Sequence, residues 1–157
     1  MLVLSSCVDL FCIPNASETL RLESKALQGT IPTEIERLKR LLELSLDHNE
    51  LTGTISSGIG KLQLTTLSLW DNKLSGTIPP EIGDNPFLSS IFLHNNDLRG
   101  TIPPEMFMQS SLLDLTLNAN QLTGSIPTEI GDSLLQICEY VCKFTFQHKD
   151  THFFQNN

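Results

Sequence analysis

Residues 91–106 read IFLHNNDLRGTIPPEM, and this stretch occurs in five variants along the 157-residue chain. The glycines at the centres of the variants lie 24, 23, 24 and 24 residues apart. They are Gly29, Gly53, Gly76, Gly100 and Gly124. A repeat of nearly constant length in this range is typical of a solenoid, in which each coil packs against its neighbours. We therefore expect one domain built of stacked coils.

Four of the variants begin with a complete L-x-L-x-x-N-x-L pattern, with isoleucine in place of the first leucine in one of them. The alternation in L-x-L predicts a short strand with one buried face, which must pair with the equivalent strands of neighbouring repeats. The asparagine is expected to end the strand, point inward and satisfy backbone groups at the turn, so that stacked copies form a ladder. The ladder residues are Asn49, Asn72, Asn96 and Asn120.

This pattern, followed by T/S-G-x-I-P, resembles the plant-type leucine-rich repeat over about residues 20–132. The resemblance implies an α/β solenoid, a short right-handed horseshoe with a parallel β-sheet on its concave face. It also implies a second, shorter sheet after the L-x-G-x-I-P word and 3₁₀ or short helical segments on the convex side. We assign residues 1–19 to an N-terminal cap or clipped signal region. Residues 20–132 form the repeat array, whose first copy is partial, and residues 133–157 form a divergent C-terminal cap or a disordered tail.

Some positions depart from the repeat pattern. Lys25 replaces the ladder asparagine in the partial first copy, and Asn85 occupies a position where other copies have leucine. Ser56 and Ser57 replace the proline and threonine of the I-P-T word, which predicts a local tightening of the convex side. After Asp132 the periodicity stops, which fits either a genuine cap or a truncation or splicing artefact.

The cysteines bracket the array in two close pairs, Cys7 with Cys12 and Cys138 with Cys142. An even number of cysteines at the ends of the array suits cap disulfides in an oxidising compartment. Asn15 begins an N-x-S sequence, which is an acceptor for N-glycosylation. The N-terminal apolar run lacks a positively charged n-region and reads as a clipped signal or a degenerate cap. These features favour an extracellular glycoprotein, secreted or at the cell surface.

The composition and motifs exclude several function classes. A net charge of -8 argues against nucleic acid as a partner, because phosphate binding needs a basic face. No run reaches the roughly 18 apolar residues of a membrane-spanning helix. Cys138, Cys142, His148 and His152 resemble a zinc set, but the five residues between the two pairs are too few for a zinc finger. A disulfide, free thiols or disorder explains them better, so we expect no metal or cofactor.

The concave sheet is the surface that the sequence nominates for binding. Residues between and just after the strand leucines should point away from the core, and among them is Trp70, the only tryptophan. Phe92 and His94 should lie beside it on the next strand, because neighbouring strands are about 4.8 Å apart. Aromatic side chains flanked by Asp and Asn are typical of binding hot spots, whereas chance occupation of variable positions is the alternative. The candidate ligand-binding residues are Asp47, His48, Trp70, Asp71, Phe92, His94, Asn95 and Asn118.

The repeats are similar to those in the ectodomains of leucine-rich-repeat receptor-like proteins and kinases, and in secreted inhibitor proteins. The resemblance implies a non-catalytic module for protein or peptide recognition in signalling, acting as a monomer through its concave face. We expect a fragment or a soluble relative of such a receptor-like protein. The alternative is an extracellular or cell-wall structural protein that binds glycan. No nucleophile elbow, phosphate-binding loop or HExxH motif indicates an enzyme.

Overall fold

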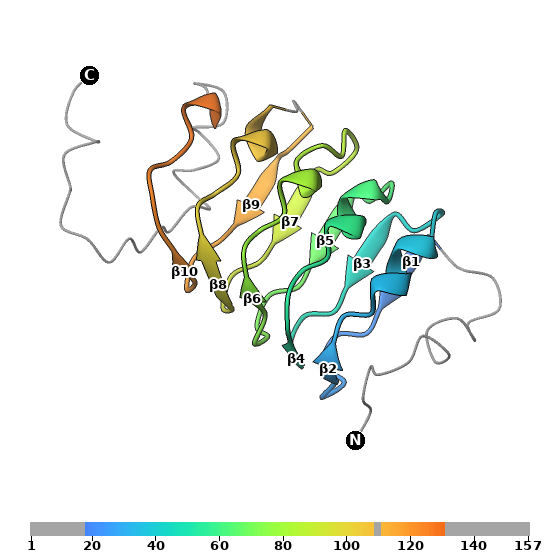
Figure 1. Cartoon of the computed structure of the whole chain (residues 1–157). Coiled ribbons are helices and arrows are strands. Elements are labelled where there is room, and N and C mark those ends of the chain that lie inside the picture. The colour runs from blue at the N-terminus through green and yellow to red at the C-terminus, as the bar shows by residue number, and fades with distance from the viewer. Residues whose placement is uncertain (1–17, 109–110, 131–157) are drawn as a thin grey trace.

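The computed structural model describes residues 18–108 and 111–130, which form a solenoid of stacked coils (Figure 1). Each coil contributes one strand to a main sheet, a second short strand, and a 3₁₀ segment on the opposite side. The predictions for Cys7, Cys12, Asn15, Cys138 and Cys142 lie outside the described residues. So does the predicted cap or tail at residues 133–157.

The main sheet has five parallel strands in the order β1-β3-β5-β7-β9. The strands are aligned in step, so that the apolar residue at the centre of each strand lies opposite its counterpart in the next coil. This register follows from the L-x-L alternation, because a slip by one residue would turn every buried leucine outward. The strands are β1 (Thr19–Arg21), β3 (Glu43–Ser45), β5 (Thr66–Ser68), β7 (Ser90–Phe92) and β9 (Asp114–Thr116).

A second set of parallel strands follows the turn in each coil. It comprises a pair, β2-β4, and a three-stranded sheet in the order β10-β8-β6, connected by an isolated bridge between Thr54 and Ser75. In these strands each residue pairs with the residue two positions before its repeat counterpart in the next coil, so that Thr30 lies opposite Thr52. The strands are β2 (Gln28–Thr30), β4 (Glu50–Thr52), β6 (Ser75–Gly76), β8 (Asp97–Gly100) and β10 (Gln121–Leu122).

The side opposite the main sheet consists of short 3₁₀ helices, as the resemblance implied. They are η1 (Thr33–Arg37), η2 (Ser57–Lys61), η3 (Pro80–Ile82), η4 (Pro104–Phe107) and η5 (Thr128–Ile130). Proline precedes η1, η3 and η4 with a φ between -63° and -65°, which fixes the direction in which the chain enters. Before η2 a serine takes the place of the proline. It caps the segment, because Ser56 Oγ accepts a hydrogen bond from the Gly58 N–H.

The core between the two sides is aliphatic, as the low aromatic content predicts. Phe107 is the only aromatic among the buried hydrophobic residues of the described ranges. Asn85, in a leucine position, is also buried, yet its amide is satisfied. Its Nδ2 donates to the carbonyl oxygens of Leu62 at 2.9 Å and Leu64 at 3.2 Å, and its Oδ1 accepts from the Phe87 N–H.

A ladder of asparagine side chains runs along the turn that ends each main strand. Asn72 Nδ2 donates to the Leu69 carbonyl in its own coil at 3.1 Å and to the Leu46 carbonyl in the preceding coil at 3.0 Å. Asn72 Oδ1 accepts from the Leu51 N–H at 3.0 Å. The same contacts recur at the other ladder residues, Asn49, Asn96 and Asn120. Each asparagine therefore joins two coils through their backbone groups, and neighbouring asparagines share carbonyl oxygens such as that of Leu46.

The repeated glycines belong to this scaffold. Gly53 has a φ of +80°, and a Cβ there would lie 2.8 Å from the Thr30 Cγ2 of the preceding coil. Both the left-handed backbone and the close approach require glycine at this position. The glycines therefore recur because every coil makes the same turn close to the coil before it.

Candidate functional site on the concave sheet

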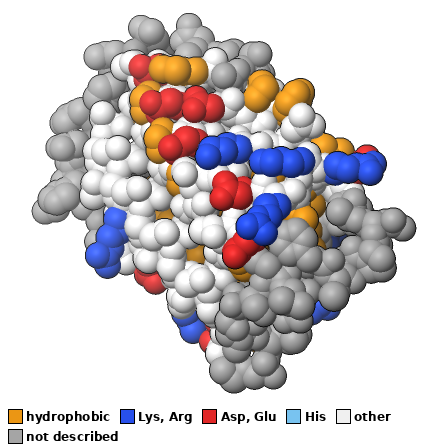
Figure 2. All heavy atoms as spheres, turned by 45° about the vertical axis from the view of Figure 1, so that its right-hand side comes forward, with side chains coloured by type: hydrophobic (Ala, Val, Ile, Leu, Met, Phe, Trp, Pro, Cys, Tyr) orange, Lys and Arg blue, Asp and Glu red, His pale blue; other side chains and the backbone are white. Residues whose placement is uncertain are grey.

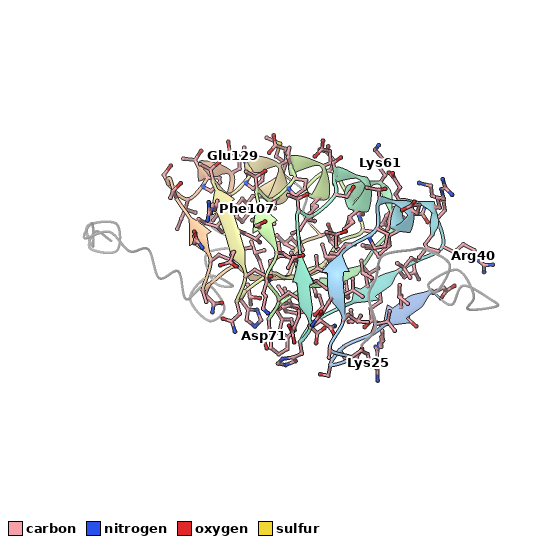
Figure 3. All side chains as sticks on the ribbon, turned by 60° about the horizontal axis from the view of Figure 1, so that its bottom comes forward. Lys25, Arg40, Lys61, Asp71, Phe107 and Glu129 are labelled. Carbon is pink, nitrogen blue, oxygen red and sulfur yellow. The ribbon has the colours of Figure 1, made fainter. Side chains whose placement is uncertain are left out.

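The candidate site lies on the exposed face of the main sheet and in the turns just after its strands. In all five described coils the third residue after the main strand adopts a left-handed conformation, with φ between 53° and 56°. Asn, Asp and His tolerate this conformation better than most residues, and three of the five positions carry one of them. The five residues are Ser24, His48, Asp71, Asn95 and Ala119. Figure 3 shows Asp71 at this edge of the solenoid, opposite the edge that carries Lys61 and Glu129.

Three aromatic rings from successive coils form a continuous row, called the ring row below. The rings of His48 and Trp70 meet edge to face with centroids 3.9 Å apart and an interplanar angle of 66°. The rings of Trp70 and His94 are stacked, with centroids 4.8 Å apart and an interplanar angle of 14°. Both are favourable arrangements of aromatic rings. Trp70 and His94 are half-buried and His48 is exposed, so the row is supported from below and open to solvent above.

Hydrogen bonds hold the two outer rings of the row. His48 Nδ1 lies 2.6 Å from Asp71 Oδ2, and His94 Nδ1 lies 2.7 Å from Thr116 Oγ1. Burial lowers the pKa of His94 below its ordinary value. The nearby His48 adds to this decrease in the pKa, while the carboxylate of Asp71 opposes it. His94 therefore favours the neutral imidazole in the folded chain.

Asp47 was expected to point into solvent, but it is nearly covered, with 9% of its surface exposed. Its Oδ1 accepts a hydrogen bond of 2.7 Å from Ser68 Oγ, and Ser68 is itself buried. Sequence reasoning missed this contact, because both residues occupy positions that the alternation assigns to the exposed face. The repeat register could have indicated it, because Ser45 of Asp47's own coil lies opposite Ser68 in the sheet.

Phe92 lies on the same face as the ring row, but within its strand and not in the turn that follows the strand. It is half-buried on β7, where it pairs with Ser68 on one side and Thr116 on the other. The ring stacked on Trp70 is therefore that of His94 and not that of Phe92.

The turns that carry the site are joined to one another by backbone hydrogen bonds. The N–H of His48 donates to the Trp70 carbonyl, and the N–H of Asp71 donates to the His94 carbonyl, each at 3.1 Å. The next turn continues the series, because the Asn95 N–H donates to the Asn118 carbonyl at 3.0 Å. Asn95 is exposed and Asn118 is half-buried. The remaining candidates thus extend the same rigid row toward the C-terminal coil.

Within residues 18–108 and 111–130, no group of three or more His, Cys, Asp or Glu side chains is arranged to hold a metal ion. The helices of the described part are all too short to cross a membrane.

Comparisons with known proteins agree with the repeat pattern. The family model described as Leucine Rich Repeat matches residues 40–62 and 63–85, which cover β3 to η3. No curated protein sequence matches the chain.

Solved structures similar to the chain include the complex PEPR1-AtPEP1, with 38% identity and a TM-score of 0.71 over 72% of this chain and 16% of that one. The plant peptide hormone receptor RGFR1 in complex with RGF2 is 34% identical, with a TM-score of 0.65, over 71% of this chain and 22% of that one. A plant ice-binding protein is 37% identical, with a TM-score of 0.69, over 72% of this chain and 37% of that one. The chain thus spans well under two thirds of the length of each.

The family model, the five in-step parallel strands and the asparagine ladder lead to one conclusion. The chain belongs to the leucine-rich-repeat family and is of the plant type.

Proposed function

We propose that the chain is a non-catalytic recognition module that binds a peptide or an extended protein segment through its concave face. The observation that carries this proposal is the ring row, in which His48, Trp70 and His94 are packed against one another and held by hydrogen bonds before any ligand arrives. Aromatic side chains dominate many binding hot spots, and preorganisation lowers the entropic cost of association.

The dimensions of the sheet suit a short extended ligand. Four steps between the five strands, at about 4.8 Å each, give a face about 19 Å long. An extended peptide of roughly six residues spans that length, since each residue adds at most about 3.3–3.6 Å. Such a peptide, lying along the solenoid axis, runs parallel to the ring row, which belongs to the three middle coils of the five.

The similar structures give this proposal partial support. One of them is a plant peptide hormone receptor in complex with RGF2. Another is an ice-binding protein, so the scaffold by itself does not select a ligand. The choice of a peptide therefore rests on the ring row. By analogy with the receptor, we propose that the chain is a fragment or a soluble relative of a receptor-like protein and acts outside the cell.

The experiment is a selection of random dodecapeptides, displayed on phage, against the immobilised chain. The affinities of the recovered peptides are then measured by calorimetry for the wild type and for the double variant Trp70→Ala/His94→Ala. Loss of a hot-spot pair should weaken binding at least tenfold. A matched control, Phe87→Ala/Met108→Ala, removes two exposed apolar side chains that lie outside the ring row and should change the affinity less than about twofold.

Thermal unfolding of both double variants checks that they remain folded. Unchanged affinity in Trp70→Ala/His94→Ala would remove the concave face from the proposal. Retention of the chain on immobilised wall polysaccharides, without any recovered peptide, would favour the glycan-binding alternative.

A further inference from the structure

We propose that the residue of the ligand that contacts the ring row is cationic, an arginine or a lysine. This inference rests on the proposed function and names the chemistry of the partner.

The concave face has an excess of negative charge. The strands of the main sheet and the three residues after each strand carry five carboxylates and one guanidinium, a balance of -4 with histidine neutral. The carboxylates belong to Glu23, Glu43, Asp47, Asp71 and Asp114.

The single guanidinium on this face, that of Arg21, is already engaged. Its Nε and Nη2 donate to the two carboxylate oxygens of Glu43 at 3.0 and 2.9 Å. This pair lies at the N-terminal end of the sheet, on β1 and β3, so it leaves the carboxylates at the ring row without an Arg or Lys partner on this face.

Four other cations lie on a different side. Arg37, Lys39, Arg40 and Lys61 are exposed in or just after η1 and η2, which oppose the main sheet. Figure 2 shows Lys and Arg side chains gathered in a row on one face of the molecule. Lys25, exposed in the turn after β1, lies at the same edge as Asp71 (Figure 3), and Lys73 is paired with Glu50. A partner of the concave face therefore meets mainly, but not only, negative charge.

Two carboxylates accompany the ring row. Asp71 is exposed, and its Oδ2 contacts His48, while Asp47 is nearly covered and its Oδ1 accepts a hydrogen bond from the Ser68 hydroxyl. A carboxylate in a partly desolvated position is less screened than one in open water, so its charge acts more strongly on a bound group.

The combination of rings and carboxylates fits a side chain with an apolar stem and a charged tip. Lys and Arg bury their methylene stems along apolar surface and keep the charged head in a polar setting. The edge of the ring row supplies the apolar surface, and Asp71 supplies an acceptor that a guanidinium fork can meet with two hydrogen bonds. An acidic ligand residue would meet like charges at the same place.

The fluorescence of Trp70 can report binding at this site, because Trp70 is the only tryptophan in the chain. We would titrate the full chain with hexa-arginine, hexalysine and hexaglutamate and follow tryptophan emission. The test variant is Asp47→Asn/Asp71→Asn. Its matched control is Asp84→Asn/Asp97→Asn, which removes the same net charge from exposed positions off the concave face. Circular dichroism verifies the fold of each variant, and Asp71→Asn alone replaces the test variant if the double variant does not fold.

We expect the cationic peptides to shift the Trp70 emission with saturation, and hexaglutamate to leave it unchanged. The half-saturation concentration should rise at least about fivefold in Asp47→Asn/Asp71→Asn and less than about twofold in the control. Equal weakening in both variants, or no emission change with either cationic peptide, would overturn the inference.

The outcomes separate this inference from the proposed function. If the phage selection recovers neutral or acidic peptides whose binding is lost in Trp70→Ala/His94→Ala, recognition at the ring row stands and its preference for a cation fails. If binding survives in that variant, the proposed function fails as well.

Discussion

At the scale of single residues, the left-handed turn positions show how the scaffold and the site share the same backbone. His48, Asp71 and Asn95 suit this conformation, whereas Ala119 has the same backbone with a φ of 54° and no polar side chain to stabilise it. Replacing Ala119 with glycine should raise the free energy of unfolding by about 0.5–1 kcal/mol, because the steric cost of the Cβ disappears and outweighs the extra freedom of the unfolded chain. Urea denaturation checks this value, and a loss of stability would contradict the reading of the turn.

His94 links the site to pH. Its folded-state pKa is lowered by burial, so the unfolded chain, with a pKa near 6.5, binds a proton more readily than the folded one. The free energy of unfolding should therefore fall as the pH drops from above about 6.5 toward the lowered pKa. His94→Gln removes this contribution while leaving an amide that can bond to Thr116. Denaturant midpoints measured from pH 7.5 to 5 should fall less in the variant, and parallel curves for both proteins would refute the assignment.

At the scale of elements, the asparagine ladder fastens one coil to the next. Asn72→Ala leaves the Leu51 N–H without its partner, whereas the Leu46 carbonyl keeps its bond from Asn49 Nδ2, and the substitution should cost about 1–3 kcal/mol of stability. The matched control is Asn95→Ala, an exposed neighbour of the next ladder residue, whose removal should cost at most about 1 kcal/mol. Chemical denaturation of the two variants gives the comparison, and equal losses would argue against the ladder as the main link.

The sequence predicted the individual strands and turns better than it predicted the contacts between neighbouring coils. The main strands and the ladder follow from L-x-L and the repeated asparagine, because each has a short-range cause that recurs in every coil. The two-residue stagger of the second strands was not predicted, because it depends on how whole coils tilt on one another. The hydrogen bonds of Asn85 were also missed, because its partners Leu62 and Leu64 belong to the preceding coil.

The same distinction holds for the candidate site. The repeat register placed Trp70 and His94 on neighbouring coils, and their rings are stacked. It did not reveal that His48 joins the row or that Asp47 is covered by its contact with Ser68. Both outcomes depend on side-chain rotamers across coils, which a repeat alignment does not specify. The role of these residues in binding stays a prediction.

At the scale of the whole molecule, the residues that build the solenoid are distinct from those that we propose to contact a ligand. Leucines, asparagines and glycines recur in every coil and form the core and the turns, whereas the exposed positions of the main sheet differ from coil to coil. A ligand that lies along the axis therefore reads one variable residue set per coil, and the ring row is the largest aromatic feature in that path. The excess of carboxylates on this face makes the path mainly negative.

The most direct test of the account is to locate a bound peptide. A recovered dodecapeptide that carries a benzophenone side chain is photo-crosslinked to the wild-type chain, and the attachment sites are read by mass spectrometry. We expect crosslinks within residues 66–71 and 90–95, which hold β5, β7 and the turns that follow them. Crosslinks confined to the 3₁₀ segments η1 to η4 would contradict recognition through the concave face.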